Sequence, residues 1–363
     1  MKKVLIAGAG KIGSLIAMML LESRRSAVCV IDSNSQSEEL MKLNHVFPEL
    51  VFQTLDVTDL KSLQDYMQYH GVDAVVSALP YYLNEFIAQS AYKVGVHYFD
   101  LTEDVQVTQK ITQLAKGAKT AFVPQCGVAP GFINIATEYL MKQFDECCEV
   151  KLRVGGIPQY INNVFHYGLT WSLDGLINQY INSCPAIENR IKVMHQPLQD
   201  LETLMIHGKP YEAFNTSGGV GHLVETKLGK VQSLNYKTIR YPGHCEKIRF
   251  LIEDLKLKNH KTLLHQILEI NLPKIEDDVL LFYVSVTGKK NGQSIEKHYV
   301  HEIFPHRILN QAWTAMQTAT ASSVCSVVDM VLQDPIAPMG LILHERFDFN
   351  VFLSNPFATC FSN

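Results

Sequence analysis

The feature that most constrains this chain is a glycine-rich turn close to its start. Val4-Leu5-Ile6-Ala7 is a short apolar run, typical of a strand buried on both faces of a parallel sheet. It leads directly into Gly8-Ala9-Gly10-Lys11-Ile12-Gly13, and an apolar helical pattern follows. In this order, Gly8 permits a tight turn, Gly10 lets the backbone approach a pyrophosphate, and Gly13 lets the helix pack close to the strand. The exposed amides at the start of that helix would then bind the phosphates.

The residue that ends the next apolar run bears on which dinucleotide would bind. Residues 27–31 are typical of a second buried strand, and Asp32 follows them, nineteen positions after Gly13. A carboxylate at this point accepts hydrogen bonds from the adenosine ribose hydroxyls and repels a 2′-phosphate. Ser33 and Asn34 come next, and neither could receive that phosphate as an Arg or Lys would. The sequence therefore favours NAD over NADP; a glycine turn that binds no nucleotide is the alternative.

Strand and helix patterns alternate as far as residue 123. Further apolar runs predict strands at 51–57, 74–79, 96–101 and 121–123. Helical patterns lie between them at 59–69, 83–93 and 104–116. This alternation predicts an α/β fold, a Rossmann-type doubly wound parallel sheet with the strand order 3-2-1-4-5-6. Ligands bind at the carboxyl ends of such strands, where the expected cofactor-binding residues are Asp56, Val57, Ala78, Leu79, Pro80 and Asp100.

The character of the chain changes after Gln125. Alternating or β-branched segments predict strands at 149–157, 163–171, 222–226, 231–241, 279–288 and 295–304. Helical patterns occur at 132–143, 173–181, 246–255, 260–270 and 312–332. They predict an inserted α+β domain, a mostly antiparallel sheet with one face covered by helices. We expect a dinucleotide-binding domain at 1–127, the inserted domain at 128–308, and a helix and tail at 309–363 that return to the first domain.

Composition excludes several classes of protein. The net charge of -4 argues against a surface for nucleic acid or for an anionic membrane. No apolar run approaches the roughly 18 residues needed to span a bilayer. The cysteines, adjacent only at Cys147-Cys148, have neither metal-ligand spacing nor the density of a disulfide scaffold. We therefore expect a cytoplasmic protein with reduced thiols and no metal.

Several motifs beyond the glycine turn recur in a known enzyme family. In the first half they are Ala78-Leu79-Pro80-Tyr81-Tyr82, Tyr98-Phe99-Asp100-Leu101-Thr102-Glu103 and Cys126-Gly127-Val128-Ala129-Pro130-Gly131. In the second half they are Gly155-Gly156-Ile157-Pro158-Gln159, Tyr211-Glu212-Ala213-Phe214-Asn215-Thr216 and Lys237-Thr238-Ile239-Arg240-Tyr241-Pro242-Gly243-His244. With these motifs the whole chain resembles the saccharopine dehydrogenase family, and within it the lysine 6-dehydrogenase branch.

This resemblance implies an NAD(P)-dependent oxidoreductase that transfers a hydride between nicotinamide and a carbon of the C–N bond in lysine or saccharopine. It also implies that the inserted domain serves substrate binding and homodimerisation. One loop departs from the branch: where an acidic residue and then Gly-Leu-Arg are expected, 216–222 is Thr-Ser-Gly-Gly-Val-Gly-His. Two alternatives therefore stay open, a carboxynorspermidine-type imine reductase and a non-catalytic nucleotide-binding sensor on the same scaffold.

Binding of an amino acid requires a cation for its carboxylate. Arg240 is the first candidate, because a guanidinium fork matches a carboxylate bidentately, and Lys237 is the second. A cross-strand surface salt bridge is the alternative for both, and strand alternation places the two on opposite faces. The other expected substrate-binding residues are Tyr81, Tyr82, Gly127, Asn215 and Thr216.

Oxidation of an amine also releases a proton. The candidates to accept it are Asp100 and Glu103, at the end of the fifth strand, together with His222 and His244. Either carboxylate could instead hold the ammonium group of the substrate. A histidine titrates near neutral pH, although each of these two could equally be a surface or helix-capping residue with its hydrogen bonds satisfied.

Overall fold

The chain folds into two compact units. The computed structural model describes residues 1–336 and 338–362, so two positions of the predicted C-terminal segment, 337 and 363, lie outside the described residues. One unit comprises Met1–Phe132 and Gln317–Asn363, and the other comprises Ile133–Met316. The second unit is therefore inserted into the sequence of the first, between residues 132 and 317.

The first unit is built on a parallel sheet. Its strands are β1 (Lys2–Ala7), β2 (Ser26–Asp32), β3 (Val51–Thr54), β4 (Ala74–Ser77), β5 (His97–Asp100), β6 (Ala121–Val123) and β17 (Gly340–Leu341). They lie in the order β17-β6-β5-β4-β1-β2-β3, and every neighbouring pair is parallel. This confirms the predicted order 3-2-1-4-5-6, with β17 added beyond β6 when the chain returns.

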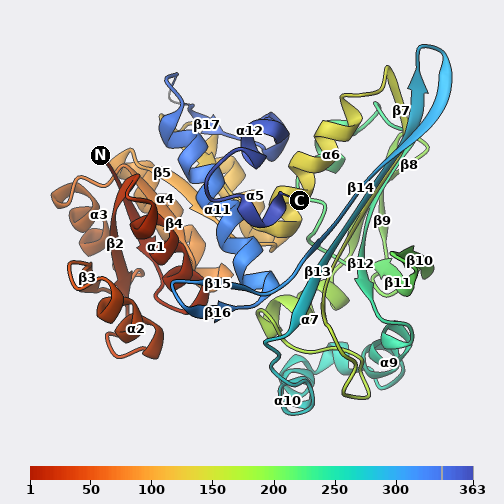
Figure 1. Cartoon of the computed structure of the whole chain (residues 1–363), viewed down its shortest axis with the longest axis horizontal. Coiled ribbons are helices and arrows are strands. Elements are labelled where there is room, and N and C mark those ends of the chain that lie inside the picture. Colours follow the sequence, from red (N-terminus) through yellow and green to blue (C-terminus); the bar gives the residue numbers. More distant parts are fainter. Residues whose placement is uncertain (337, 363) are drawn as a thin grey trace. The chain divides into compact units, whose positions relative to one another are not determined.

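Helices pack on this sheet from both sides (Figure 1). They are α1 (Lys11–Ser23), α2 (Glu38–Val46), α3 (Leu60–Tyr69), α4 (Asn84–Val94), α5 (Val105–Ala115), α11 (Ala315–Gln333, from Gln317 onward) and α12 (Phe349–Leu353). Single 3-10 turns occur at Tyr81–Leu83, His344–Arg346 and Thr359–Phe361. The helices α3, α4 and α5 are neighbours in one layer, and α1 contacts α2. Apolar residues of β1, β4 and β5 and of α3 to α5 form a buried core between sheet and helices.

The helix α2 was not predicted from the sequence. Its start carries a clear local signal, because the Ser37 hydroxyl accepts a hydrogen bond from the Leu40 amide at 3.2 Å and Glu38 lies in the first turn. Only Leu40 and Leu43 of this helix are buried, however. So few apolar residues do not produce a helical period in the sequence.

The second unit contains a mixed sheet that is mostly antiparallel. Its strands are β7 (Glu146–Pro158), β8 (Cys184–Glu188), β9 (Ile191–His195), β10 (Glu202–Ile206), β11 (Lys209–Asn215), β12 (Ser233–Arg240), β13 (Asp278–Lys290) and β14 (Gln293–Ile303). Their order is β10-β11-β12-β7-β13-β14, and β8 pairs with both β12 and β9. Only the pair β12–β7 is parallel. A small separate hairpin follows, formed by β15 (His306–Ile308) and β16 (Gln311–Trp313).

Helices cover one face of this mixed sheet, as the sequence predicted. They are α6 (Ile133–Met141), α7 (Leu173–Ile181), α8 (Leu223–Lys227), α9 (His244–Arg249) and α10 (Lys261–Asn271), with single turns at Phe250–Asp254 and Leu257–Asn259. Apolar residues of α7, α9 and α10 pack together with Phe214 of β11. The opposite face carries a smaller apolar cluster that includes Ile157, Ile239 and Leu281.

Two predicted strands of this unit are wrong. Residues 163–171 form a loop, in which the Asn163 amide group donates to the Tyr167 carbonyl and accepts from the Phe165 amide. Side-chain bonds of this kind replace the ladder bonds of a strand. Residues 222–226 fall on the helix α8, because the turn at Gly221 (φ +57°) redirects the chain before Leu223 and Val224 are buried.

Candidate functional site

The glycine turn of the first unit has little room for side chains. A Cβ at Gly8, where φ is +105°, would lie 2.9 Å from the Ala78 carbonyl oxygen, and one at Gly13 would lie 1.9 Å from the Gly8 oxygen. A Cβ at Gly10 would meet nothing within 4 Å. Gly8 and Gly13 are thus required for packing, whereas Gly10 borders open space. Lys11 and Ile12 begin α1, whose first turn has neither an acidic residue nor a side-chain cap, so its amides are available for phosphate.

Asp32 lies directly beside this turn. Its Oδ2 accepts a hydrogen bond from the Ala9 amide at 2.6 Å, and its Oδ1 accepts one from the Asn34 amide at 2.8 Å. A carboxylate has about four acceptor positions, so both oxygens can still accept from ribose hydroxyls. The only lysine that α2 adds nearby is Lys42, which pairs with Glu38. The residues present therefore fit a dinucleotide, with the phosphates at α1 and the ribose at Asp32.

Other predicted cofactor residues lie at the same edge of the sheet. The Ala78 amide bonds to the Ala7 carbonyl at 2.8 Å, which fixes the segment Ala78-Leu79-Pro80 beside the turn. Asp56 is an exposed residue after β3, and two bonds from Thr58, from its amide and its hydroxyl, lower the pKa of its carboxyl. Val57, in contrast, is buried in the core of this unit. The structure thus places the Asp56 side chain outward and the Val57 side chain inward.

Two tyrosines follow this segment. Tyr81 is partly exposed and Tyr82 is 60% exposed, and their rings meet edge to face with centroids 5.7 Å apart. Both belong to the single 3-10 turn Tyr81–Leu83.

Asp100 is a buried carboxylate that ties two strand ends together. Its Oδ2 accepts from the Tyr98 hydroxyl at 2.7 Å, and its Oδ1 accepts from the amides of Thr102 and Gln125, each at 2.9 Å. Burial raises the pKa of its carboxyl to about 6, although the three hydrogen bonds oppose that rise. Because both oxygens are engaged, Asp100 fixes the segment that leads to Gly127.

Glu103 and Gly127 lie close to the ends of β5 and β6. Glu103 is partly exposed, one residue before Asp104, which caps α5 by accepting from the Val107 amide. The Gly127 carbonyl accepts from the Ser323 hydroxyl of α11 at 2.8 Å and from the Phe132 amide at 3.1 Å. The backbone of Gly127 is therefore held by the returning helix.

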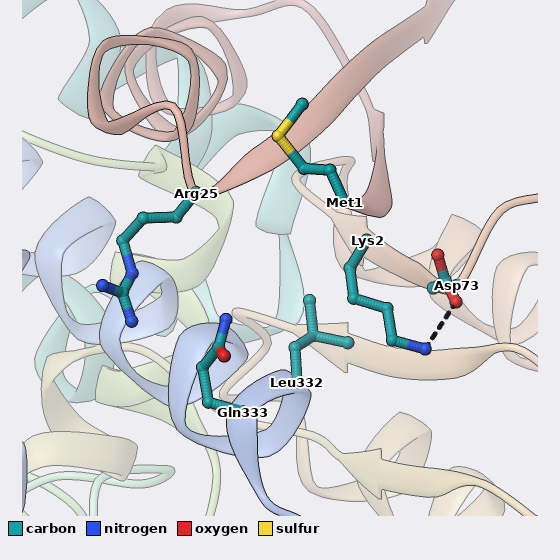
Figure 2. A pocket seen from close by; sticks show the side chains of 6 residues that line it. All are labelled: Met1, Lys2, Arg25, Asp73, Leu332 and Gln333. Carbon is teal, nitrogen blue, oxygen red and sulfur yellow. Dashed lines mark hydrogen bonds and ion pairs between the residues drawn. The ribbon is translucent and has the colours of Figure 1, made fainter.

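A shallow surface pocket lies at the opposite ends of these strands. Figure 2 shows its lining: Met1, Lys2, Arg25, Asp73, Leu332 and Gln333. Lys2 precedes β1's buried part and Asp73 precedes β4, so the pocket lies at the amino ends of the strands. Its charges are paired already, Lys2 with Asp73 at 2.9 Å and Arg25 with Asp329 at 2.8 Å. Ligands of a doubly wound sheet bind at the carboxyl ends, so this pocket is not the nucleotide site.

In the second unit a buried guanidinium lies without a carboxylate partner. Arg240 is 2% exposed, and its Cζ lies 4.5 Å from the centre of the Tyr167 ring. Its Nε donates to the Tyr180 hydroxyl at 3.2 Å, and its Nη1 donates to Thr238 Oγ1 at 2.7 Å and to the Ile239 carbonyl at 2.8 Å. Within the described part of the chain, Nη2 has no acceptor. An uncompensated buried charge is costly, and an anionic ligand would remove that cost.

The reason for the missing partner lies in the neighbouring strand. Glu212 on β11 is directly opposite Arg240 in the ladder. Its carboxylate turns instead to the start of α9 and accepts from the amides of Gly243 at 2.8 Å and Cys245 at 2.6 Å. The same helix start presents His244, which is fully buried and bonds through Nε2 to Tyr180 at 2.9 Å. The structure therefore brings Arg240 and His244 together through Tyr180.

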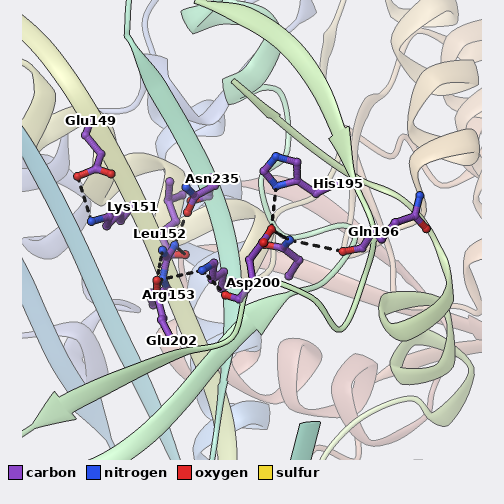
Figure 3. A network of polar contacts seen from close by, with 11 residues as sticks. Glu149, Lys151, Leu152, Arg153, His195, Gln196, Asp200, Glu202 and Asn235 are labelled. Atoms are coloured by element: carbon purple, nitrogen blue, oxygen red, sulfur yellow. Dashed lines mark hydrogen bonds and ion pairs between the residues drawn. The ribbon is translucent and has the colours of Figure 1, made fainter. Parts of the chain in front are cut away.

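Lys237 lies three positions before Arg240 on β12, so strand alternation puts the two side chains on opposite faces. Figure 3 shows the labelled Arg153, Asp200 and Glu202 of the polar network on the Lys237 side. Its Nζ donates to the Asp200 carbonyl and, at 3.0 Å, to Glu202. Glu202 also pairs with Arg153, which is 1% exposed, so one carboxylate compensates two cations. Asn215 belongs to the same network, donating to Asp200 Oδ2 at 2.6 Å. Lys237 and Asn215 thus join a network within the unit.

The loop that departs from the lysine branch is tightly packed. Thr216 is 2% exposed, and a Cβ at Gly219 would lie 2.2 Å from the Tyr236 ring. His222 is partly exposed and directly precedes α8. The structure therefore places Thr216 in a buried part of this loop and His222 at its partly exposed end.

Comparison with known proteins assigns the chain to a family. Residues 4–123 match the model of the saccharopine dehydrogenase NADP binding domain, and residues 127–358 match that of the saccharopine dehydrogenase C-terminal domain. The chain belongs to the saccharopine dehydrogenase family. It therefore has an NAD(P)-binding domain and the fold of an oxidoreductase family, as its motifs predicted.

Solved structures of this family and beyond share the fold. The apo histidine-tagged saccharopine dehydrogenase (L-Glu forming) from Saccharomyces cerevisiae superimposes with a TM-score of 0.77 at 15% identity, covering 97% of this chain and 96% of that one. The homospermidine synthase from Legionella pneumophila, in complex with NAD, gives a TM-score of 0.66 at 11% identity, covering 99% and 89%. Identities this low establish the fold alone.

Some residues of the second cluster escaped sequence analysis. Tyr180 lies in a helical pattern where it resembles any core residue, and Tyr167 lies in a segment predicted as a strand. Glu212 was part of a recognised motif, but nothing in that motif indicates that it caps α9. Within residues 1–336 and 338–362 there is no group of His, Cys, Asp and Glu that could hold a metal ion. The same residues include no helix long and apolar enough to cross a membrane.

Proposed function

We propose that this protein is an NAD-dependent oxidoreductase acting on the C–N bond of an amino acid, either lysine or a saccharopine-like secondary amine. The observation that carries the substrate class is the buried Arg240, which lacks a carboxylate partner in the C-terminal family domain. A substrate carboxylate would supply the missing negative charge and could bond to the guanidinium at Nη2. The preference for NAD over NADP rests on Asp32, because a 2′-phosphate would meet a carboxylate there.

The residues of the chain would act mainly by binding and orienting. The bound cofactor would supply or accept the hydride at its nicotinamide ring. The amides of α1 and Asp32 would hold its phosphates and ribose, and Asp100 would keep the Gln125–Gly127 segment in place. The Asp100 side chain is fully buried and already accepts three hydrogen bonds, whereas Glu103 and His222 are partly exposed, so these two stay the predicted candidates for accepting the amine proton. Tyr81, Tyr82 and Thr216 stay predicted substrate contacts.

The test is a spectrophotometric assay of the purified protein with NAD or NADP and with lysine or saccharopine at alkaline pH. Reduction of NAD by one of these amines is expected, with weaker activity on NADP. NAD binding without turnover of any amine, or turnover of an imine only in the reductive direction, would instead favour the sensor or the carboxynorspermidine-type reductase. We also propose a cytoplasmic homodimer, for which a monomer in analytical ultracentrifugation would be the contrary result.

A further inference from the structure

The contacts of His244 define which of its nitrogens carries hydrogen. Nδ1 lies 2.7 Å from the Phe165 carbonyl oxygen, which can only accept, so Nδ1 must donate. Nε2 lies 2.9 Å from the Tyr180 hydroxyl. If His244 is neutral, Nε2 can only accept, and the tyrosine hydroxyl must donate to it. The hydroxyl oxygen then accepts from Arg240 Nε, which always carries hydrogen.

The surroundings of His244 favour the neutral form. The ring is fully buried among Tyr167, Tyr180 and Phe214. The charged or titratable groups facing it are Arg240 on β12, Lys247 on its own helix and His166 of the loop 163–171, and each of them lowers the pKa of His244. The carboxylate of Glu212 is occupied by the amides at the start of α9. Burial and these neighbours lower the pKa of His244 to about 3.

We propose that Tyr180 and His244 are positioning residues that hold the Arg240 guanidinium and leave its Nη2 for a carboxylate of the substrate. They do so through one ordered chain of hydrogen bonds, which runs from Arg240 to Tyr180, from Tyr180 to His244 and from His244 to the Phe165 carbonyl. The chain runs in one direction, since each member donates to the next group toward Phe165. Arg240 Nη1 is fixed separately by Thr238 and Ile239. The carboxylate part rests on the proposed function, whereas the order of the hydrogen bonds does not.

The first experiment is nitrogen NMR of the full-length protein with labelled histidine, the His244 signal being assigned by its loss in His244→Gln. The expected result is a neutral ring with hydrogen on Nδ1 only and no titration between about pH 5 and 8. A ring that gains a proton in this range, or that carries hydrogen on Nε2, overturns the ordered chain. This measurement needs no substrate, so it tests the order of the hydrogen bonds even if the protein turns over no amine.

The second experiment measures binding of lysine and saccharopine to the NAD-loaded protein by calorimetry, with diaminopentane as a ligand that lacks the carboxylate. Tyr180→Phe is expected to weaken binding of the two amino acids about tenfold, the loss of one hydrogen bond to a charged group, and to leave diaminopentane unaffected. Tyr160→Phe, which removes the same hydroxyl from a residue that is 77% exposed, is the matched control and should leave all affinities unchanged. An equal loss for all ligands, or no binding of either amino acid to the unmodified protein, overturns the carboxylate part.

The third experiment separates positioning from proton transfer and from a purely structural role. His244→Gln can both donate to Phe165 and accept from Tyr180, whereas His244→Phe can do neither. The glutamine variant is expected to keep the amino-acid affinity of the unmodified protein, and the phenylalanine variant to lose about tenfold, as Tyr180→Phe does. Where turnover is measurable, KM should change while kcat and its pH profile do not. A fall of kcat with a shifted pH profile would instead make His244 the proton acceptor and overturn the proposal; binding without any turnover would count against the proposed function alone.

Discussion

A single carboxylate, Asp32, is expected to decide between the two nicotinamide cofactors. Replacing it with asparagine keeps the shape of the side chain and removes the charge that a 2′-phosphate would meet. We expect Asp32→Asn to weaken NAD binding about tenfold, the cost of losing a charged acceptor, and to reduce the ratio of NAD to NADP affinity by at least as much. Fluorescence titration of both cofactors would measure this ratio.

The matched control for this change is Asp65→Asn on α3. Asp65 is exposed and pairs with Lys61 one helical turn away, so its replacement removes the same charge without touching the glycine turn. Both cofactor affinities should then stay as they are. An Asp32→Asn variant that keeps its NAD to NADP ratio would show that the carboxylate does not select the cofactor.

The part of the site that is local in sequence was predictable at the level of residues. The glycine turn and Asp32 are separated by one helix, and each position has a steric or electrostatic requirement that the sequence displays. Arg240 and His244 were also named, but their relation was not, because Tyr180 and Glu212 reach them from other elements. A contact that depends on the packing of α7 and α9 on the sheet has no signature in a linear pattern.

At the scale of elements, the network around Glu202 joins three strands of the mixed sheet. Glu202 on β10 pairs with Arg153 on β7 and with Lys237 on β12. Glu202→Gln would leave two buried cations without their shared carboxylate, which we expect to lower the free energy of unfolding by about 2–4 kcal/mol. Urea unfolding of the second unit, followed by circular dichroism, would measure this loss.

The control for that change is Glu225→Gln on α8. Glu225 pairs with Lys192 at 2.6 Å, but both side chains are about half exposed. Exposed pairs contribute about 0–1 kcal/mol, so this variant should unfold almost as the unmodified protein does. An equal loss of unfolding free energy in the two variants would show that the Glu202 network stabilises the protein no more than an exposed ion pair does.

The start of α11 should make the stability of the second unit depend on pH. The Asp278 carboxylate accepts from the amides of Ala315 at 2.6 Å and Met316 at 3.0 Å, and burial raises its pKa to about 6. The folded protein then binds the Asp278 proton more tightly than the unfolded chain does. The stabilisation that comes from this protonation is fully present below the unfolded pKa of about 3.9, and it is lost as the pH rises through about 6. From about pH 4 to pH 7, Asp278→Asn should therefore gain about 1–3 kcal/mol relative to the unmodified protein.

Urea unfolding at several pH values would measure this difference for the Asp278 variant. The reference is Asp277→Asn, which alters the neighbouring residue and removes the same charge. It should show no comparable gain, since among the described residues Asp278, and not Asp277, accepts the hydrogen bonds from the start of α11. If the difference in unfolding free energy between Asp278→Asn and the unmodified protein stays constant across this range, the pKa of Asp278 is not raised in the folded protein.

Elements with strong hydrophobic periods were predictable, and short polar ones were not. All the strands of the parallel sheet up to β6 were located. The strands β1, β2 and β4 are mostly buried and continuously apolar, whereas the exposed edge strand β3 was located from the alternation of strand and helix patterns. The hairpins β8–β9 and β10–β11 were missed. Their turns at Asn189-Arg190 and His207-Gly208 have positive φ at both positions, the geometry of tight hairpins, but only the second contains the glycine that usually marks such a turn.

At the scale of the whole molecule, the phosphates and ribose of the cofactor are expected to bind to the first unit, and the substrate carboxylate to Arg240 of the second unit. Binding to the native state alone stabilises it by mass action, by about 2.7 kcal/mol at a hundredfold excess over Kd. Hydrogen exchange of the full chain with NAD should therefore slow at residues 4–13, 26–34 and 74–79 of the first unit. Adding lysine or saccharopine should slow exchange further at 165–180 and 236–245 of the second.

The same experiment in Asp32→Asn and in Tyr180→Phe tests whether the two responses belong to separate residues. The Asp32 variant should show less protection by NAD in the first unit, since the ribose acceptor is weakened. The Tyr180 variant should keep that protection and show a weaker response to the amino acid, because its glycine turn is unchanged while Arg240 Nε loses its acceptor. An equal weakening of both responses in either variant would contradict separate roles for the Gly8–Gly13 turn and the Arg240 cluster.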